Sequence, residues 1–372
     1  MIEDNHAFDV IYTDFAKAFD SVPHERLFVK LSSLGIQGDI LAWIKSFLRG
    51  RTQCVNVDGE TSGWRDVLSG IPQGSVIGPI LFVIFINDMP DEVKFNMCKL
   101  FADDCKLYGV VERHEANTMQ QDLDRLQEWS TRWQLPFNAK KCKAMHFGAS
   151  NPRRKYKMSE HILEATEQEK DLGVMIDPTL KFHVHTSAAT KKANQILGLV
   201  KKTYTTRDAT SISTLYKSMV RPHLEYGNTI WGPFYVGDAK SVGAVQRRAT
   251  KLIPELRNLP YESRLKALNL PSLVYRRKRG DMIQVYKIMN GMVRVNKDDF
   301  FDPSRIEQTR GHNQRIAKNK ATKNVRINSF SQRVINDWNS LPVNVIKTES
   351  LNLFKNSLDD VWSDKMFVTL ED

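Results

Sequence analysis

The chain has 372 residues, of which 41% are hydrophobic, so it is long and apolar enough for roughly two or three domains and is not a disordered protein. Its net charge of +11 favours an anionic partner such as nucleic acid, although a protein kept soluble by lysine would show the same excess. The start of the chain is polar, and the longest apolar run, Ile80–Ile86, is too short to cross a bilayer. We therefore expect an intracellular protein, in the nucleus or the cytoplasm, that is neither secreted nor bound to a membrane.

The charge is divided unevenly along the chain. Residues 1–150 hold 16 lysines and arginines against 20 acidic residues, whereas the remaining 222 residues hold 38 against 23. This division suits a metal-binding catalytic part joined to a surface that holds phosphate groups. The four cysteines include no C-x-x-C pair, so neither a zinc ribbon nor a disulfide framework is indicated.

The first part of the chain alternates strand and helix patterns. Val10–Tyr12 is a β-branched and aromatic run, which predicts a buried strand that ends at Asp14. Two helices are expected next, one that stops at Gly35 and one over residues 39–48. Asp58-Gly59 lies within an alternating segment and predicts a hairpin. The apolar face of the second helix is predicted to comprise Ile40, Trp43, Ile44 and Phe47.

A mixed order of elements continues beyond residue 69. Residues 69–79 are rich in glycine and proline and lead into a buried helix, and two strands are expected to meet in a tight turn at Asp103-Asp104. Helices with many lysines and arginines are expected from about residue 182. This order predicts an α+β fold rather than a doubly wound sheet. The other expected elements are a buried helical stripe over 119–133 and strands over 143–148 and 172–177.

Three aspartates follow or separate predicted buried strands. Asp14 ends the first strand, and Asp103 and Asp104 lie at the predicted turn 89 and 90 residues later. Carboxylates at turns are usually only solvated, but two adjacent acids at the tip of a buried hairpin repel one another unless a cation holds them. Two Mg²⁺ ions about 3.5–4 Å apart would suit such carboxylates and an in-line phosphoryl displacement. This chemistry alone fits a polymerase, a nuclease or a phosphatase.

Three segments resemble motifs A, B and C of reverse transcriptases, and all three lie between Tyr12 and Asp104 in the family's order. The tetrapeptide F-A-D-D alone would be weak evidence, because four letters match by chance. The three together identify the chain as similar to that family. They read Y-T-D-F-A-K-A-F-D at 12–20, G-I-P-Q-G-S at 70–75 and F-A-D-D at 101–104.

Four segments point to a particular group within that family, because they are similar to LINE-type, jockey-like non-LTR retrotransposons. The likeness to this group extends over nearly the whole chain. Members of that group carry an endonuclease and a fingers region before motif A, whereas Met1 stands 13 residues before Asp14, so we expect a chain truncated upstream of motif A. The segments are D-F-A-K-A-F-D-S-V-P-H at 14–24, V-R-P-H-L-E-Y at 220–226, V-Q-R-R-A-T-K at 245–251 and W-N-S-L-P at 338–342.

The resemblance implies an RNA-directed DNA polymerase that uses an RNA template, a DNA primer and deoxynucleoside triphosphates. It implies that Asp14 and Asp103 hold two Mg²⁺ ions and that Asp104 completes the acidic triad. Lys141 would protonate the pyrophosphate leaving group, although Lys140 and Lys143 stand beside it.

The resemblance also implies nucleotide contacts. Phe19 would exclude a ribose 2′-OH, although a plain core phenylalanine is the alternative. Gln73 and Gly74 would lie against the incoming nucleotide and the template base, where glycine lets the backbone approach closely. Phe15 is expected to contribute to the same nucleotide site, and Leu172-Gly173 begins a segment similar to the primer grip.

The basic back half suits a polymerase thumb that holds nucleic acid largely by charge. Arg247, Arg248 and Lys251 are expected to contact the nucleic-acid backbone, although ordinary helices with solvated basic faces are the alternative. The run Arg276–Arg279 is also compatible with a nuclear-import signal.

We therefore expect an α+β right-hand polymerase palm, an antiparallel sheet backed by helices, followed by a helical thumb-like and C-terminal region. The expected domains are 1–180 (palm, motifs A to E), 181–290 (basic, thumb-like) and 291–372 (C-terminal extension). The alternative function is that of a catalytically inactive remnant that only binds RNA or DNA.

Overall fold

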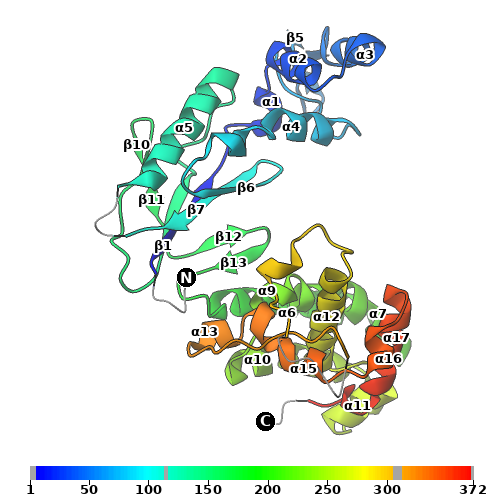
Figure 1. Ribbon diagram of the computed structural model, residues 1–372. Helices are drawn as coiled ribbons and strands as arrows, with labels where there is room; N and C mark the ends of the chain where they lie inside the picture. The colour runs from blue at the N-terminus through cyan, green and yellow to red at the C-terminus, as the bar shows by residue number, and fades with distance from the viewer. Residues whose placement is uncertain (1–5, 113–115, 305–311, 370–372) are drawn as a thin grey trace. The chain divides into compact units, whose positions relative to one another are not determined.

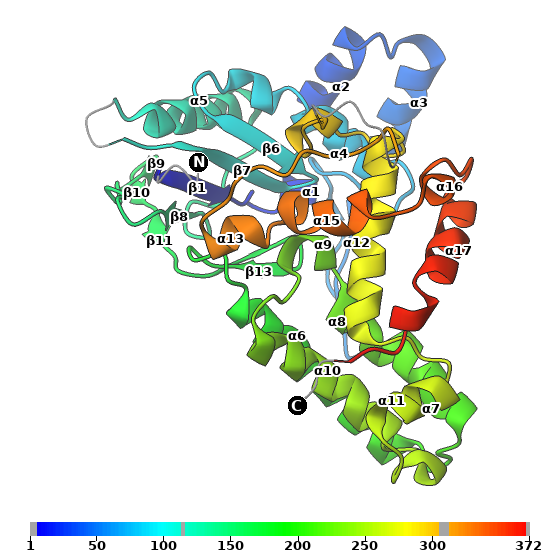
Figure 2. The same ribbon diagram turned by 60° about the horizontal axis from the view of Figure 1, so that its bottom comes forward.

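The computed structural model describes residues 6–112, 116–304 and 312–369. It divides into two compact units, Met1–Glu167 and Gln168–Asp372, drawn in Figures 1 and 2. The first unit is built on a sheet with helices, and the second is mostly helical. The three-domain division at residues 180 and 290 stays a prediction.

A five-stranded sheet forms the centre of the first unit, in the order β11-β8-β1-β7-β6. Every neighbouring pair is antiparallel except β11 and β8, so the predicted antiparallel sheet is mixed at one edge. The α+β class is confirmed. The strands are β1 (Phe8–Thr13), β6 (Met97–Phe101), β7 (Asp104–Val110), β8 (Lys143–Phe147) and β11 (Glu164–Ala165).

Strand β1 is the middle strand of the sheet, and its side chains are buried on both faces. Val10 and Ile11 point to opposite faces and are both buried, as the apolar run at this position predicted. The strand pairs with β7 on one side and with β8 on the other. The predicted strands at 143–148 and on both sides of Asp103 are also confirmed, but the predicted burial of the strand before Asp103 is wrong, because β6 is an edge strand and Phe101 is 65% exposed.

Helices complete the first unit. The stripe predicted over 119–133 is confirmed as α5, which lies alongside the sheet in both views (Figures 1 and 2). Met119, Leu123, Leu126 and Trp129 are each at most 1% exposed and belong to the main core. The helices are α1 (Ala18–Ser21), α2 (His24–Ser33), α3 (Gly38–Leu48), α4 (Gly78–Ile86) and α5 (Thr118–Trp133), with a 3-10 turn η1 (Met89–Glu92).

The predicted helix over 39–48 is confirmed as α3, but its predicted apolar face is wrong at two of its four residues. Ile44 is buried together with Leu48, whereas Ile40 is 65% and Trp43 58% exposed. The Trp43 ring instead stacks on Phe47, with ring centres 5.8 Å apart. Because α3 packs chiefly against α2, only one edge of its apolar stripe has a neighbour to cover it.

The first unit also contains short two-stranded sheets. The hairpin predicted at Asp58-Gly59 is confirmed, and both residues have the positive φ angles that such a tight turn requires, +52° and +91°. The pairings join β2 (Thr52–Gln53) to β5 (Arg65–Asp66), β3 (Asn56–Val57) to β4 (Glu60–Thr61) and β9 (Lys157–Met158) to β10 (His161–Ile162).

The second unit confirms the helices predicted from residue 182. It begins with a hairpin of β12 (Glu169–Asp171) and β13 (Val174–Ile176). One of its cores lies among α6, α8 and α10, and another joins α12 to the C-terminal helices through Tyr286 stacked on Phe354, with ring centres 4.2 Å apart. The helices are α6 (His183–Thr203), α7 (Ala209–Leu215), the π-helix η2 (Tyr216–Val220), α8 (Arg221–Glu225), α9 (Asn228–Trp231), α10 (Val236–Thr250), η3 (Pro254–Leu256), α11 (Tyr261–Ala267), α12 (Leu273–Met289), η4 (Lys297–Asp299), α13 (Asn324–Ile327), α14 (Phe330–Arg333), α15 (Ile335–Asn339), α16 (Val343–Ile346), α17 (Leu351–Val361) and η5 (Ser363–Lys365).

Within the described parts of both units, no helix has the length and apolar character needed to cross a membrane.

Candidate active site

The three predicted catalytic aspartates lie at one end of the sheet. The β1–β7 ladder ends with the pair Thr13 and Cys105. Asp14 follows the first of these residues and Asp104 precedes the second, so the register brings both aspartates to the same end of neighbouring strands. Asp103 lies in the two-residue turn between β6 and β7. A strand pairing therefore unites residues that are about 90 positions apart in the sequence.

The loop of residues 138–142, which carries the predicted proton donor, is hydrogen-bonded to the backbone of Asp14. The N–H of Asn138 donates to the Asp14 carbonyl at 2.7 Å, and the Asp14 N–H donates to the Cys142 sulfur at 3.4 Å. The loop carries Lys141, whose ammonium nitrogen lies 3.3 Å from Asp14 Oδ2. Their side chains are 69% and 36% exposed, so the pair is open to solvent. Lys140 is exposed and forms no ion pair with a described residue.

The glycine of motif B fits closely against motif A. A Cβ on Gly70 would lie 2.7 Å from the carbonyl oxygen of Asp20, and the φ angle of this glycine is +89°. Its N–H donates to the carbonyl of Val22 and the next N–H to that of Phe19, both at 2.8 Å. His24 Nε2 lies 2.8 Å from the Gly70 carbonyl oxygen. Motif B is thereby held against the residues that follow Asp14.

Two of the predicted nucleotide contacts are exposed in motif B. Gln73 donates its side-chain N–H to Asp20 Oδ1 at 3.1 Å. Gly74 has a φ angle of +81° and no atom within 4 Å of the position of a Cβ. Glycine is therefore favoured at Gly74 by backbone conformation and not by a close approach within the chain.

The two predicted phenylalanines differ in burial. Phe19 is half-buried, and its ring stacks on Phe82 with ring centres 4.7 Å apart. Phe15 is 3% exposed and stacks on Phe137 at 4.6 Å, so its ring is a core side chain. A nucleotide role for either residue stays a prediction.

Asp122 supports the β6–β7 hairpin, which carries two of the predicted catalytic aspartates, and it was not predicted from the sequence. Its carboxylate accepts the backbone N–H groups of Lys94, Phe95 and Asn96 at 2.9–3.0 Å, in the loop that precedes β6. Burial raises the pKa of Asp122, but these hydrogen bonds outweigh burial and leave the pKa below its ordinary value. The only sequence signal is an acid inside a buried helical stripe.

Leu172 and Gly173 form the turn between β12 and β13, with φ angles of +44° and +87°. Tyr226 supports this turn, because its hydroxyl donates to the Leu172 carbonyl at 2.9 Å. A Cβ on Gly173 would lie 2.9 Å from the Tyr226 ring. The predicted primer-grip residues therefore lie at a hairpin tip that Tyr226 supports. The sequence predicts no such role for Tyr226, which is only part of the family-like segment 220–226.

The predicted backbone contacts lie at the end of α10. Arg247 lies over the ring of Tyr261, with its guanidinium carbon 4.9 Å from the ring centre. Arg248 donates to Asn194 Oδ1 at 2.9 Å, and Lys251 is exposed.

The basic run at the start of α12 is mostly held in internal ion pairs. Arg276, Lys278 and Arg279 pair with Glu225, Asp337 and Asp359, respectively. Three of the four cations in this run are therefore paired with acids of the same unit, although Lys278 stays exposed to solvent.

The residues at the end of the β1–β7 ladder fit a divalent metal ion by their chemistry. Carboxylate oxygens are the ligands that Mg²⁺ prefers, and it usually binds through one or two carboxylates while substrate phosphates complete its shell. Asp14 already lies beside a cation, the ammonium of Lys141. In the part of the chain that the structure describes, no group of three or more His, Cys, Asp or Glu side chains closes on one point.

Comparisons with known proteins show the family of the chain. Residues 7–199, more than half of the chain, match the family model described as reverse transcriptase (RNA-dependent DNA polymerase). The chain belongs to this reverse transcriptase family, and its predicted likeness to jockey-like elements is confirmed.

Two relatives illustrate that likeness. The probable RNA-directed DNA polymerase from transposon X-element of Drosophila melanogaster is 31% identical over 257 residues, which cover 65% of this chain and 28% of the relative. The RNA-directed DNA polymerase from mobile element jockey of Drosophila funebris is 31% identical over 236 residues, 59% of this chain and 25% of the relative. The chain thus spans about a quarter of their length.

Among solved structures, apo telomerase from Candida tropicalis is similar over 71% of this chain and 45% of that chain, with 12% identity and a TM-score of 0.40.

Proposed function

We propose that the chain is the polymerase part of an RNA-directed DNA polymerase from a jockey-like mobile element. It joins deoxynucleoside triphosphates to a DNA primer in the order set by an RNA template. The observation that carries this proposal is the meeting of Asp14, Asp103 and Asp104 at one end of the sheet, with Lys141 beside Asp14. Membership of the reverse transcriptase family selects a polymerase among the reactions that such carboxylates serve.

In the proposed reaction the primer 3′-oxygen attacks the α-phosphorus of the nucleotide, and the bond from that phosphorus to the pyrophosphate oxygen breaks. Asp14, Asp103 and Asp104 would hold two Mg²⁺ ions, which when bound neutralise charge on the attacking and leaving oxygens. Lys141 donates a proton to the leaving pyrophosphate. Its ion pair with Asp14 keeps this ammonium group close to the carboxylates.

The same proposal assigns the nucleotide contacts. Gln73, oriented by its hydrogen bond to Asp20, and the backbone of Gly74 lie against the nucleotide and template base. Phe19, held by its stacking on Phe82, excludes a ribose 2′-OH. Phe15 contributes through its backbone, because its ring is buried.

In the second unit we assign the grip on the nucleic acid to two places. The hairpin tip at Leu172-Gly173 holds the primer. The backbone of the template or primer is contacted by Arg247 and Arg248 in the last turn of α10 and by Lys251 directly after it. The excess of positive charge in this part of the chain supports both assignments.

The experiment that tests the polymerase proposal is primer extension on poly-rA/oligo-dT with magnesium. We expect Asp103→Asn to abolish extension and Asp58→Asn to retain it. The control is matched, because Asp58 also lies in a two-residue hairpin turn and is exposed. Extension that survives Asp103→Asn would overturn the mechanism.

The second candidate is a protein that binds nucleic acid without catalysis. The excess of positive charge in the second unit favours this candidate. It predicts nucleic-acid binding that weakens as the salt concentration rises and that does not change with magnesium or with Asp103→Asn. Absence of extension by folded wild-type protein that still binds the template would select this candidate.

A further inference from the structure

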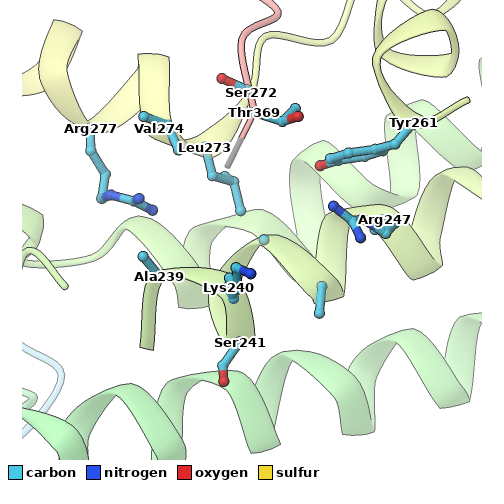
Figure 3. A pocket seen from close by; sticks show the side chains of 12 residues that line it. Ala239, Lys240, Ser241, Arg247, Tyr261, Ser272, Leu273, Val274, Arg277 and Thr369 are labelled. Atoms are coloured by element: carbon cyan, nitrogen blue, oxygen red, sulfur yellow. The ribbon is translucent and has the colours of Figure 1, made fainter. Parts of the chain in front are cut away.

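A cavity of about 300 Å³ lies between α10 and the N-terminal end of α12. Figure 3 shows three basic side chains around it: Arg247 and Lys240 from α10, and Arg277 from α12. No aspartate or glutamate is among the described residues that line it. The cavity is therefore electropositive, and it belongs entirely to the second unit.

Arg277 is the exceptional member of its basic run. Its three basic neighbours pair with acids, but Arg277 forms no ion pair with a described residue, and its buried Nη1 has no hydrogen-bond partner among them. The nearby acid Asp281 is engaged by Arg333 through two hydrogen bonds of 2.9 Å. Burial lowers the pKa of Arg277 to about 10, so the group remains charged at neutral pH.

The start of α12 adds a second source of positive potential. Ser272 caps this 17-residue helix by accepting the N–H of Tyr275 at 3.2 Å. Leu273 and Val274, the first two helical residues, line the cavity, and their N–H groups have no acceptor within the helix. A helix start of this kind attracts anions through its dipole and its N–H groups.

Tyr261, the aromatic residue that lines the cavity, positions an arginine side chain and does not offer its ring for stacking on a nucleobase. Two guanidinium carbons, those of Arg247 and Arg264, lie 4.9 and 5.4 Å from the ring centre of Tyr261. The hydroxyl of Tyr261 is bound to Gln246, which fixes the ring. The ring therefore holds Arg247 at the cavity and is itself already covered by cations.

We propose that this cavity is a phosphate-binding site, in which Arg277, Arg247 and Lys240 hold the phosphate beside the start of α12. The phosphate belongs to a nucleic-acid backbone, an assignment that rests on the proposed function. The same chemistry would also hold the phosphate of a small free molecule, and the experiment separates the two sources.

The test measures binding of a fluorescent 12-residue oligo-dT, and of inorganic tripolyphosphate by itself, to the full chain in EDTA. Arg277→Gln should raise the Kd for the oligonucleotide about tenfold. Lys278→Gln, which removes the same charge one residue away from a side chain paired with Asp337, should leave it within about twofold.

A second pair of variants guards against misfolding. Gly243 lies in helical backbone at the cavity, and a Cβ there meets no atom within 4 Å. Gly243→Glu should place a carboxylate among the cations and weaken binding about tenfold, whereas Gly243→Gln, of nearly equal size, should not.

Equal binding by all variants to both probes would overturn the site, as would equal weakening by Arg277→Gln and Lys278→Gln. Loss confined to tripolyphosphate would keep the phosphate site and overturn its assignment to nucleic acid. Because EDTA prevents polymerisation, the result does not depend on activity. A catalytically active chain with unchanged binding would overturn this site alone, and an inactive chain with the expected losses would overturn only the proposed polymerase.

Discussion

The two units hold their charges in different ways. The first unit has 20 lysines and arginines against 23 acidic residues, and its predicted functional acids lie where strands end. The second has 34 against 20, yet several of its arginines are bound by acids of the same unit. Strand register positions the carboxylates, whereas ion pairs between helices engage the cations.

This difference shows that net charge overestimates the number of cations that are available to bind a ligand. The basic run of α12 has four cations in sequence, but Arg276 and Arg279 fasten α12 to α8 and α17 instead of facing a ligand. Only Arg277 lacks a partner within the described residues. The predictions below test whether the pairs of the second unit are structural and the acids of the first are functional.

The largest expected effect is on the stability of the second unit. Arg333→Gln should lower the free energy of unfolding by about 3–5 kcal/mol, because it leaves the buried carboxylate of Asp281 without its cation. Lys266→Gln, which breaks an exposed pair with Glu262, should cost at most about 0.5 kcal/mol. Urea unfolding of both variants measures the difference, and equal losses would show that the buried pair is not structural.

The next effect is catalytic and belongs to the first unit. Lys141→Gln should reduce the rate of nucleotide incorporation about 100-fold, because the leaving pyrophosphate loses its proton donor. Lys140→Gln should change it little, since that side chain makes no ion pair with a described residue. Single-turnover extension measures both rates. A similar loss in both variants would mean that general charge near the carboxylates, rather than a specific proton donor, supports the reaction.

A smaller effect concerns the contact between motifs A and B. Gly70→Ala should lower the free energy of unfolding by about 2–3 kcal/mol, because the new Cβ meets the backbone of Asp20 and the φ angle is positive. Gly74→Ala should cost about 1 kcal/mol, since only the φ angle opposes it. Thermal unfolding compares them, and a larger loss at Gly74 would contradict the close fit.

Local patterns were sufficient to predict the elements that carry the site. The apolar run before Asp14 predicted β1, because burial of a strand shows in its residue types. The apolar residues around Asp103 predicted the β6–β7 hairpin, but the predicted burial of its first strand is wrong, since β6 is an edge strand and Phe101 is 65% exposed. Family motifs then indicated which aspartates to join, and the register of β1 with β7 joined them.

Contacts between distant elements could not be predicted in this way. Trp43 is exposed on a helix whose stripe looks fully apolar, because exposure depends on how many neighbours pack against the helix. Arg277 resembles the cations beside it in sequence, and only the fold shows which of them meet acids. The local signal of Asp122, an acid inside a buried helical stripe, does not identify its partners, since its donors lie 26–28 residues earlier.

Asp122 provides the smallest effect and a contrast between the units, because its carboxylate accepts three backbone N–H groups in addition to its ion pair with Arg125 at 2.8 Å. Asp122→Asn should cost about 1–2 kcal/mol at pH 7, since the amide keeps only one acceptor oxygen and its NH2 group faces N–H donors that the second carboxylate oxygen accepts.

The pH dependence distinguishes this cause from a packing defect. The folded-state pKa of Asp122 lies below its ordinary value, so its contribution is complete above an unfolded-state pKa of about 3.9 and is lost as the pH falls through the folded-state pKa. Urea unfolding of the wild type and Asp122→Asn should therefore differ at pH 7 and converge as the pH falls below about 4. A constant difference over that range would assign the loss to packing, and would mean that the charge on Asp122 does not hold the loop before the β6–β7 hairpin.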